Sequence, residues 1–155
     1  MYIRNINVKV ELEGGNLIRA IGEMENKPEG ANAEHFKVEV VVVIDNFEII
    51  KVENVEMCVL YPPCYEILPK LQNIIGITIT QGYSKKIREL IGGNEGCTHM
   101  VELLLEIGRS INAGYGYGYL VKNFGIAANL EFYNKRDAAK CIGFTRYQQQ
   151  NRQEI

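Results

Sequence analysis

The chain has 155 residues, a formal net charge of -2 at pH 7 and a hydrophobic fraction of 46%. This length and composition fit one globular domain with a single core, and they exclude a disordered or fibrous chain. The near-neutral charge argues against nucleic acid and anionic lipid as partners, because both are bound by clustered Lys and Arg. We therefore expect a single domain over residues 1–155, and another copy of the chain stays open as a partner.

The chain also lacks the signals of membrane insertion and secretion. No apolar run approaches the roughly 20 residues that span a bilayer, and Met1-Tyr2-Ile3-Arg4 leads into strand residues in place of a signal peptide. We therefore expect a cytoplasmic protein without membrane contact. A domain of this length has no need of disulfides in that compartment, so its four cysteines are expected to be free thiols or metal ligands.

The first 60 residues predict an antiparallel sheet. Apolar and polar residues alternate from Val8 to Glu13, which is the pattern of a half-buried strand, and Gly14-Gly15 supplies a tight turn. Residues 25–33 are rich in turn formers and predict a loop. Further strands are expected at residues 18–24, 36–44 and 47–60. The sheet then has three to four strands.

The following residues predict helices that cover one face of this sheet. Pro62-Pro63 ends the last strand, because proline cannot donate to the strand ladder and is favoured at helix starts. Apolar residues at helical spacing indicate a helix from about Ile67, a second from Ser84 as its cap, and a third from about Gly96 to Ala113. The fold class is therefore α+β.

The C-terminal third is less regular. Alternating glycine and tyrosine from Tyr115 to Tyr119 fit either a strand or a mobile loop. Residues 134–142 are expected to form a last helix, and residues 148–155 a frayed tail.

Cys97 is the first candidate for chemistry. It opens a predicted helix, where unsatisfied N–H groups favour the thiolate and lower the pKa. The alternative is a small buried residue that packs with Val101. His99 follows two positions later, so the two side chains share a ligand only if the first turn is unwound. Otherwise His99 faces solvent near Glu102.

A metal site needs partners from elsewhere in the chain. Zinc is usually held by four Cys and His ligands, and iron-sulfur clusters by thiolates. Both His35 and Cys64 lie next to predicted strands of one sheet, at ends where loops converge. The candidate metal ligands are therefore His35, Cys64, Cys97 and His99.

Ser84, Lys85 and Lys86 indicate a different site. Lysines in the first turn of a helix oppose its dipole, so a phosphate-bearing ligand bound there relieves the repulsion. The alternative is a solvated basic turn. We interpret Cys58 as strand packing and assign no role to Cys141. No nucleophile elbow, phosphate-binding glycine loop or zinc-protease motif is present, so no reaction is assigned.

Three segments share features with a known family, namely Tyr61-Pro62-Pro63-Cys64, residues 76–79 with 82–84, and residues 87–93 running into residues 96–104. Together they resemble a bacterial domain of unknown function, number 2889. Upstream, Glu25-Asn26-Lys27-Pro28 is similar to its acidic-x-Lys segment, with Glu in place of Asp, and His35 and Asp45 fall where its strand pair would have them. The resemblance covers most of the chain and implies no activity.

The order of elements is also similar to the iron-sulfur cluster assembly scaffold fold. The ligands of that family come from a loop before a central strand and from two cysteines, which the resemblance carries over to positions near His35, Cys64 and Cys97. Histidine replaces the cysteine and aspartate of the scaffolds here, which favours zinc over a cluster.

These features lead to one main hypothesis and two others. The chain is expected to be a non-catalytic, scaffold-like protein that binds zinc or an iron-sulfur cluster. The second hypothesis is a small enzyme or binding module for an anionic, phosphate-bearing ligand, with Cys97 as a reactive thiol and Lys85 and Lys86 as phosphate ligands. The third is a structural or interaction protein whose cysteines are buried and unreactive.

Overall fold

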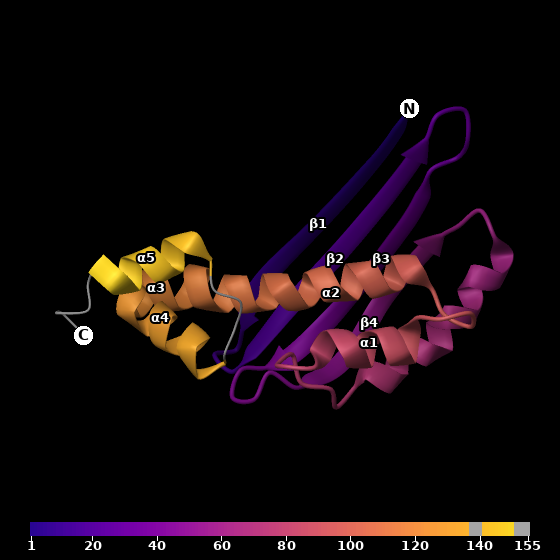
Figure 1. Ribbon diagram of the computed structural model, residues 1–155. Helices are drawn as coiled ribbons and strands as arrows, with labels where there is room; N and C mark the ends of the chain where they lie inside the picture. The colour runs from indigo at the N-terminus through magenta and orange to yellow at the C-terminus, as the bar shows by residue number, and fades with distance from the viewer. Residues whose placement is uncertain (137–140, 151–155) are drawn as a thin grey trace. The chain divides into compact units, whose positions relative to one another are not determined.

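The computed structural model describes residues 1–136 and 141–150 (Figure 1). Contacts divide the chain into two compact units, residues 1–112 and residues 113–155. The expectation of one domain over the whole chain stays a prediction. No helix in the described part of the chain is both long and apolar enough to cross a lipid bilayer.

The first unit is built on a four-stranded antiparallel sheet of simple up-and-down order. Its strands are β1 (Tyr2–Glu13), β2 (Leu17–Pro28), β3 (Glu34–Val43) and β4 (Ile49–Cys58), and each pairs with the next. The predicted α+β class and antiparallel sheet are confirmed, with the larger of the two expected strand numbers.

The loop predicted for residues 25–33 is wrong at its beginning, because β2 continues to Pro28. Asn26 has a low strand propensity. Here, however, it lies between Arg4 of β1 and Glu34 of β3 in the strand register. Pairing with polar residues of β1 and β3 thus allows β2 to continue through residues whose composition alone predicts a loop.

Three helices complete this unit. The first, η1 (Pro62–Ile74), is a 3-10 helix with proline in its first turn, followed by α1 (Tyr83–Ile91) and α2 (Thr98–Ala113). In Figure 1, α2 lies along one face of the sheet, with α1 and η1 beside it on the β4 side. A Cβ placed on Gly22 of β2 would lie 2.7 Å from Ile107 Cδ1, so glycine allows α2 to approach the sheet closely.

The core lies between this sheet face and the helices. Apolar side chains that alternate along β2 and β3 meet the apolar stripe of α2, as the helical periodicity predicts. Tyr83 of α1 is buried there, and its hydroxyl donates to the Leu104 carbonyl oxygen at 2.8 Å. Other fully or almost fully buried members are Ile18, Met24, Phe36, Val38, Ile87, Met100, Leu103 and Ile107.

The second unit is helical. It contains η2 (Gly114–Leu120), α3 (Val121–Phe124), α4 (Ile126–Lys135) and α5 (Ile142–Gln150). Neither a strand nor a loop forms at residues 115–119, because η2 is a π-helix in which the Tyr115 and Tyr119 rings stack with centroids 5.5 Å apart. Both alternatives for that segment were wrong.

The last predicted helix and the tail also differ from the structure. The helix expected at residues 134–142 is wrong, because α4 ends at Lys135 and α5 begins at Ile142. Part of that prediction, residues 137–140, lies outside the described residues. Residues 148–150 of the expected tail belong to α5, and residues 151–155 are also outside the described part.

Candidate functional site

Polar and sulfur-bearing side chains gather at one end of the sheet in the first unit. The register pairs Arg4 of β1 with Asn26 of β2, and Asn26 with Glu34 of β3. Directly paired residues of an antiparallel sheet lie on the same face. Since Asn26 and Glu34 alternate in step with the buried residues Met24 and Phe36, this polar row is on the face that the helices cover.

A tight glycine connection brings Cys97 to this end of the sheet. The backbone N–H of Cys97 donates to the Ile91 carbonyl oxygen at 2.8 Å, so the residue is held against the end of α1. A Cβ on Gly96 would lie 2.1 Å from that oxygen and 2.3 Å from the Gly92 oxygen. Glycine is therefore required before Cys97, and it leaves the Cys97 side chain only 5% exposed.

The protonation of Cys97 differs from the prediction. Burial raises the pKa of its thiol above the ordinary value. The backbone N–H groups of Met100 and His99 donate to the sulfur and lower its pKa, as expected for a thiol at the N-terminus of a helix. Burial outweighs them, so the predicted lowering of the Cys97 pKa is wrong.

Two further causes of this pKa shift locate the neighbours of Cys97. Cys64 and the Glu34 carboxylate both act on Cys97 by charge and raise its pKa, so both lie within electrostatic range of its sulfur. We call Glu34, Cys64 and Cys97 the Cys97 cluster. Its three members come from β3, η1 and the residue before α2.

The backbone around the cluster explains the positions of Cys64 and Glu34. Cys64 is half-buried in the first turn of η1, where its N–H donates to the Tyr61 carbonyl oxygen at 2.9 Å. Glu34 is 9% exposed, and its Oε1 accepts from the Leu60 N–H at 3.3 Å. The segment after β4 thus donates one hydrogen bond to Glu34 from Leu60 and then forms the first turn of η1, which contains Cys64.

The two histidines are in different places. His99 is half-buried, with its ring centroid 4.8 Å from that of Phe36, on the helix-covered side. Since consecutive strand residues point to opposite faces, His35 lies on the other face from Glu34. There it pairs with Glu25 and Cys58 and lines a shallow hollow with Asn5, Asn7 and Glu23.

The structure therefore does not bring the four predicted metal ligands together. Cys64 lies within electrostatic range of Cys97, His99 follows Cys97 by two residues on α2, and His35 lies on the other face of the sheet. Across residues 1–136 and 141–150, no three His, Cys, Asp or Glu side chains converge in a way that holds a metal ion. Sequence reasoning missed Glu34, the residue next to His35, because it did not fix which side chain points inward.

A polar network beside the cluster was also missed. Asn26 is 1% exposed, and its Oδ1 accepts from the Tyr2 hydroxyl at 2.9 Å and from Arg4 Nε at 2.8 Å. Arg4 also forms an ion pair with Glu102 of α2, at 2.6 Å. The Asn26 amide nitrogen, Nδ2, has no hydrogen-bond partner within the described residues. This network ties β1 and β2 to the first turns of α2.

Comparison with known families covers the whole of this site except the first residues of β1. A family model described as a protein of unknown function, DUF2889, matches residues 6–112. The chain belongs to the DUF2889 family. No curated protein matches the chain, and no solved structure does. The DUF2889 match ends at the residue where the first compact unit ends, so in this chain the family corresponds to the unit that carries the Cys97 cluster.

The predicted anion site of this DUF2889 chain is at the start of α1. The N-cap is Gly82 in a left-handed conformation with no side-chain cap, so the prediction that Ser84 caps the helix is wrong. Lys85 is 81% exposed, with its Nζ 3.8 Å from a carboxylate oxygen of Glu89. Lys86 is exposed as well. The basic turn is therefore open to solvent, and phosphate binding there stays a prediction.

The two remaining cysteines of the DUF2889 chain are both exposed. Cys58 is exposed at the end of β4, on the His35 side, so the interpretation as strand packing is wrong. Cys141 is exposed and precedes α5, where its sulfur accepts from the Phe144 N–H at 3.4 Å. The reactivity of these two exposed thiols can therefore be compared with that of the buried thiol of Cys97.

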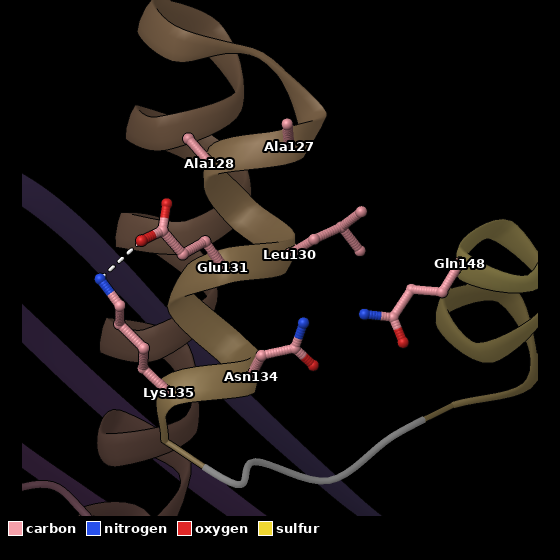
Figure 2. A pocket seen from close by; sticks show the side chains of 7 residues that line it. All are labelled: Ala127, Ala128, Leu130, Glu131, Asn134, Lys135 and Gln148. Carbon is pink, nitrogen blue, oxygen red and sulfur yellow. Dashed lines mark ion pairs between the residues drawn. The ribbon is translucent and has the colours of Figure 1, made fainter. Parts of the chain in front are cut away.

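The second unit holds a pocket of its own, between α4 and α5. Figure 2 shows Leu130 and Asn134 of α4 pointing toward Gln148 of α5. Glu131 and Lys135 form an ion pair at 2.6 Å, so the charges of this pocket offset each other. Ala127 and Ala128 complete the described lining, which contains no cysteine, serine or histidine.

Proposed function

We propose that the chain binds a thiophilic metal ion, zinc in the first place, through the Cys97 cluster. Cys64 and Cys97 act as the sulfur ligands and Glu34 as the oxygen ligand. One observation carries the proposal. Cys97 lies within electrostatic range of a second cysteine, Cys64, from a distant part of the sequence and of the buried carboxylate of Glu34.

The chemistry of these donors fits zinc. Zinc takes cysteine sulfur at about 2.3 Å and carboxylate oxygen at about 2.0–2.2 Å. An iron-sulfur cluster prefers four thiolates, and the Cys97 cluster contains two. The three donors do not converge in the metal-free arrangement, so the proposal requires their side chains to move closer together when the ion binds. His99, on the same side of the sheet, is available as a further nitrogen ligand.

Zinc binding is expected to strengthen as the pH rises. A thiol must lose its proton to bind zinc, and the raised pKa of Cys97 keeps that thiol protonated at neutral pH. Each proton released on binding makes the affinity change by about tenfold per pH unit below that pKa. Competition titration with a chromophoric zinc chelator at several pH values between 6 and 8 measures this slope.

A matched control shows whether this slope belongs to the site. The variant Cys58→Ser removes an exposed thiol outside the cluster and should leave both the affinity and its slope unchanged. An affinity for zinc that does not change with pH would contradict the proposal, because it would mean that no protonated thiol joins the ion.

The second hypothesis, a reactive thiol beside a bound phosphate, has less support. Cys97 is buried and its pKa is raised, whereas nucleophilic cysteines are exposed thiolates with lowered pKa values. We expect iodoacetamide to label Cys97 at least about tenfold more slowly than Cys58 or Cys141 in the metal-free protein. Peptide mapping by mass spectrometry gives the three rates, and fastest labelling at Cys97 would revive the reactive-thiol hypothesis.

A further inference from the structure

The free edge of β1 exposes a row of backbone hydrogen-bonding groups. β1 is the first strand in the sheet order, so β2 is its one neighbour within the sheet. Its pairing with β2 runs from Tyr2 to Glu13 without a bulge, and the described residues outside β2 offer no hydrogen bond to the β1 backbone. A long, regular edge strand of this kind is a template on which another strand can pair.

The opposite edge of the sheet, in contrast, is covered by the chain itself. The Ile49 N–H of β4 donates to the Ile77 carbonyl oxygen at 2.9 Å, and the Ile49 carbonyl oxygen accepts from the Gly76 N–H at 2.8 Å. Farther along β4, the Val52 carbonyl oxygen accepts from Gln72 Nε2 at 3.1 Å. Two irregularities also interrupt the pairing of β4 with β3. The protection that edge strands usually have is therefore present on β4 and absent from β1.

The side chains of β1 extend the apolar face of the sheet to this open edge. Val8, Val10 and Leu12 pair with residues of β2 that face the helices, so they lie on the same face. Leu12 is nevertheless 42% exposed, and Val8 and Val10 are half-buried. No residue of β1 is buried. The strand thus presents both free backbone groups and an incompletely covered apolar row.

The charges of β1 indicate what covers it. If two copies of β1 pair antiparallel about a two-fold axis normal to the sheet, the residue on the axis faces its own copy. With Val10 on the axis, Lys9 of each copy faces Glu11 of the other, and Val8 faces Leu12. Lys9 and Glu11 are exposed on the face opposite the helices, so this register forms two pairs of opposite charge.

The neighbouring registers lack this complementarity. An axis through Lys9 places two lysines directly opposite each other, and an axis through Glu11 does the same with two glutamates. Like charges in directly opposed positions are destabilising. An axis through Val8 pairs Lys9 with Asn7 and forms no pair of opposite charge. The sequence of β1 is therefore complementary to itself in the register centred on Val10.

We propose that the chain forms a homodimer in which the β1 strands of two copies pair antiparallel, centred on Val10. The two four-stranded sheets then join into one continuous sheet with the helices of both copies on the same face. Backbone hydrogen bonds supply the affinity along the edge, and the Lys9–Glu11 pairs fix the register. This interface is independent of the proposed metal site.

Analytical ultracentrifugation of the full chain tests the charge pairs. We expect a wild-type dimer, and Lys9→Glu should weaken it by at least about fivefold, because both attractive pairs become repulsive. The variant Lys9→Glu/Glu11→Lys restores opposite charges and should regain most of the affinity. Lys27→Glu is the matched control. Lys27 is exposed on β2 and, like Lys9 with Glu11, forms an ion pair within its own strand, with Glu25 at 3.0 Å.

Disulfide cross-linking tests the register. In a chain that also carries Cys58→Ser and Cys141→Ser, which remove the two exposed thiols, Val10→Cys places the new sulfurs beside each other on the axis. Mild oxidation should therefore yield a cross-linked dimer. Ile6→Cys in the same background is the control, because Ile6 lies eight residues along the strand from its own copy in this register, about 27 Å.

Three results would overturn the proposal. A wild-type chain that stays monomeric at all concentrations shows that no second copy occupies β1, which leaves the edge to a strand of another protein. Equal dissociation constants for Lys9→Glu and Lys27→Glu place the dimer contact on another surface. Equal cross-linking of the Val10→Cys and Ile6→Cys variants contradicts the register.

Discussion

Replacing Gly96 with alanine is expected to destabilise the first unit by about 3 kcal/mol, the upper end of the range for overpacking. The new Cβ would lie 2.1 Å from the Ile91 oxygen and 2.3 Å from the Gly92 oxygen. Both atoms belong to the backbone, which cannot move aside as a flexible side chain can. For a chain of this size, the melting temperature should fall by roughly 6–12 °C.

The same variant should also disturb the proposed metal site. The Gly92–Gly96 connection holds the Cys97 N–H on the Ile91 oxygen, so relief of the clash has to shift Cys97. Thermal unfolding followed by circular dichroism measures the stability, and a zinc titration measures the site. Gly118→Ala is the matched control, because nothing lies within 4 Å of its new Cβ and its φ is not positive. Equal melting temperatures for the two variants would contradict the geometry of this connection.

Replacing both Cys64 and Cys97 with serine is expected to weaken zinc binding by more than about 100-fold. Loss of a residue that only orients a ligand commonly costs 10–100-fold in metal affinity, and this change removes two ligands outright. Serine preserves the approximate size of each side chain, so the effect on folding should be smaller than the effect on binding. The competition titration described above supplies the affinity.

The double variant Cys58→Ser/Cys141→Ser is its control, since both of those thiols are exposed and lie outside the cluster. It should bind zinc like the wild-type chain. If both double variants lose zinc equally, the ion is held by thiols without regard to position, and the Cys97 cluster is not the site.

Periodicity predicted most of the first unit. Alternation along β2 and β3 and the helical stripe of α2 depend on neighbouring residues in sequence, so these elements and their buried faces could be recognised locally. The two prolines after β4 marked the end of the strand region, but η1 begins at Pro62, earlier than the predicted helix start near Ile67. In contrast, the strand character of residues 25–28 depends on partners in β1 and β3, which local composition does not contain.

The candidate site could be predicted only in part, for the same reason. The two cysteines were found by residue type, but the choice between Glu34 and His35 depends on which of two adjacent strand residues points toward the helices. Cys97 was placed correctly near a helix start, and its pKa was misjudged because burial acts against the helix dipole. The Asn26 network joins residues of β1, β2 and α2 whose sequence shows no motif.

Metal analysis of the wild-type chain tests the central proposal most directly. Protein purified without chelator, and the same protein after reconstitution with zinc and gel filtration, should contain about one zinc ion per chain. The Cys64→Ser/Cys97→Ser variant treated in parallel should contain almost none. Absence of zinc and iron from the wild-type chain both before and after reconstitution would contradict the proposal that the Cys97 cluster binds metal.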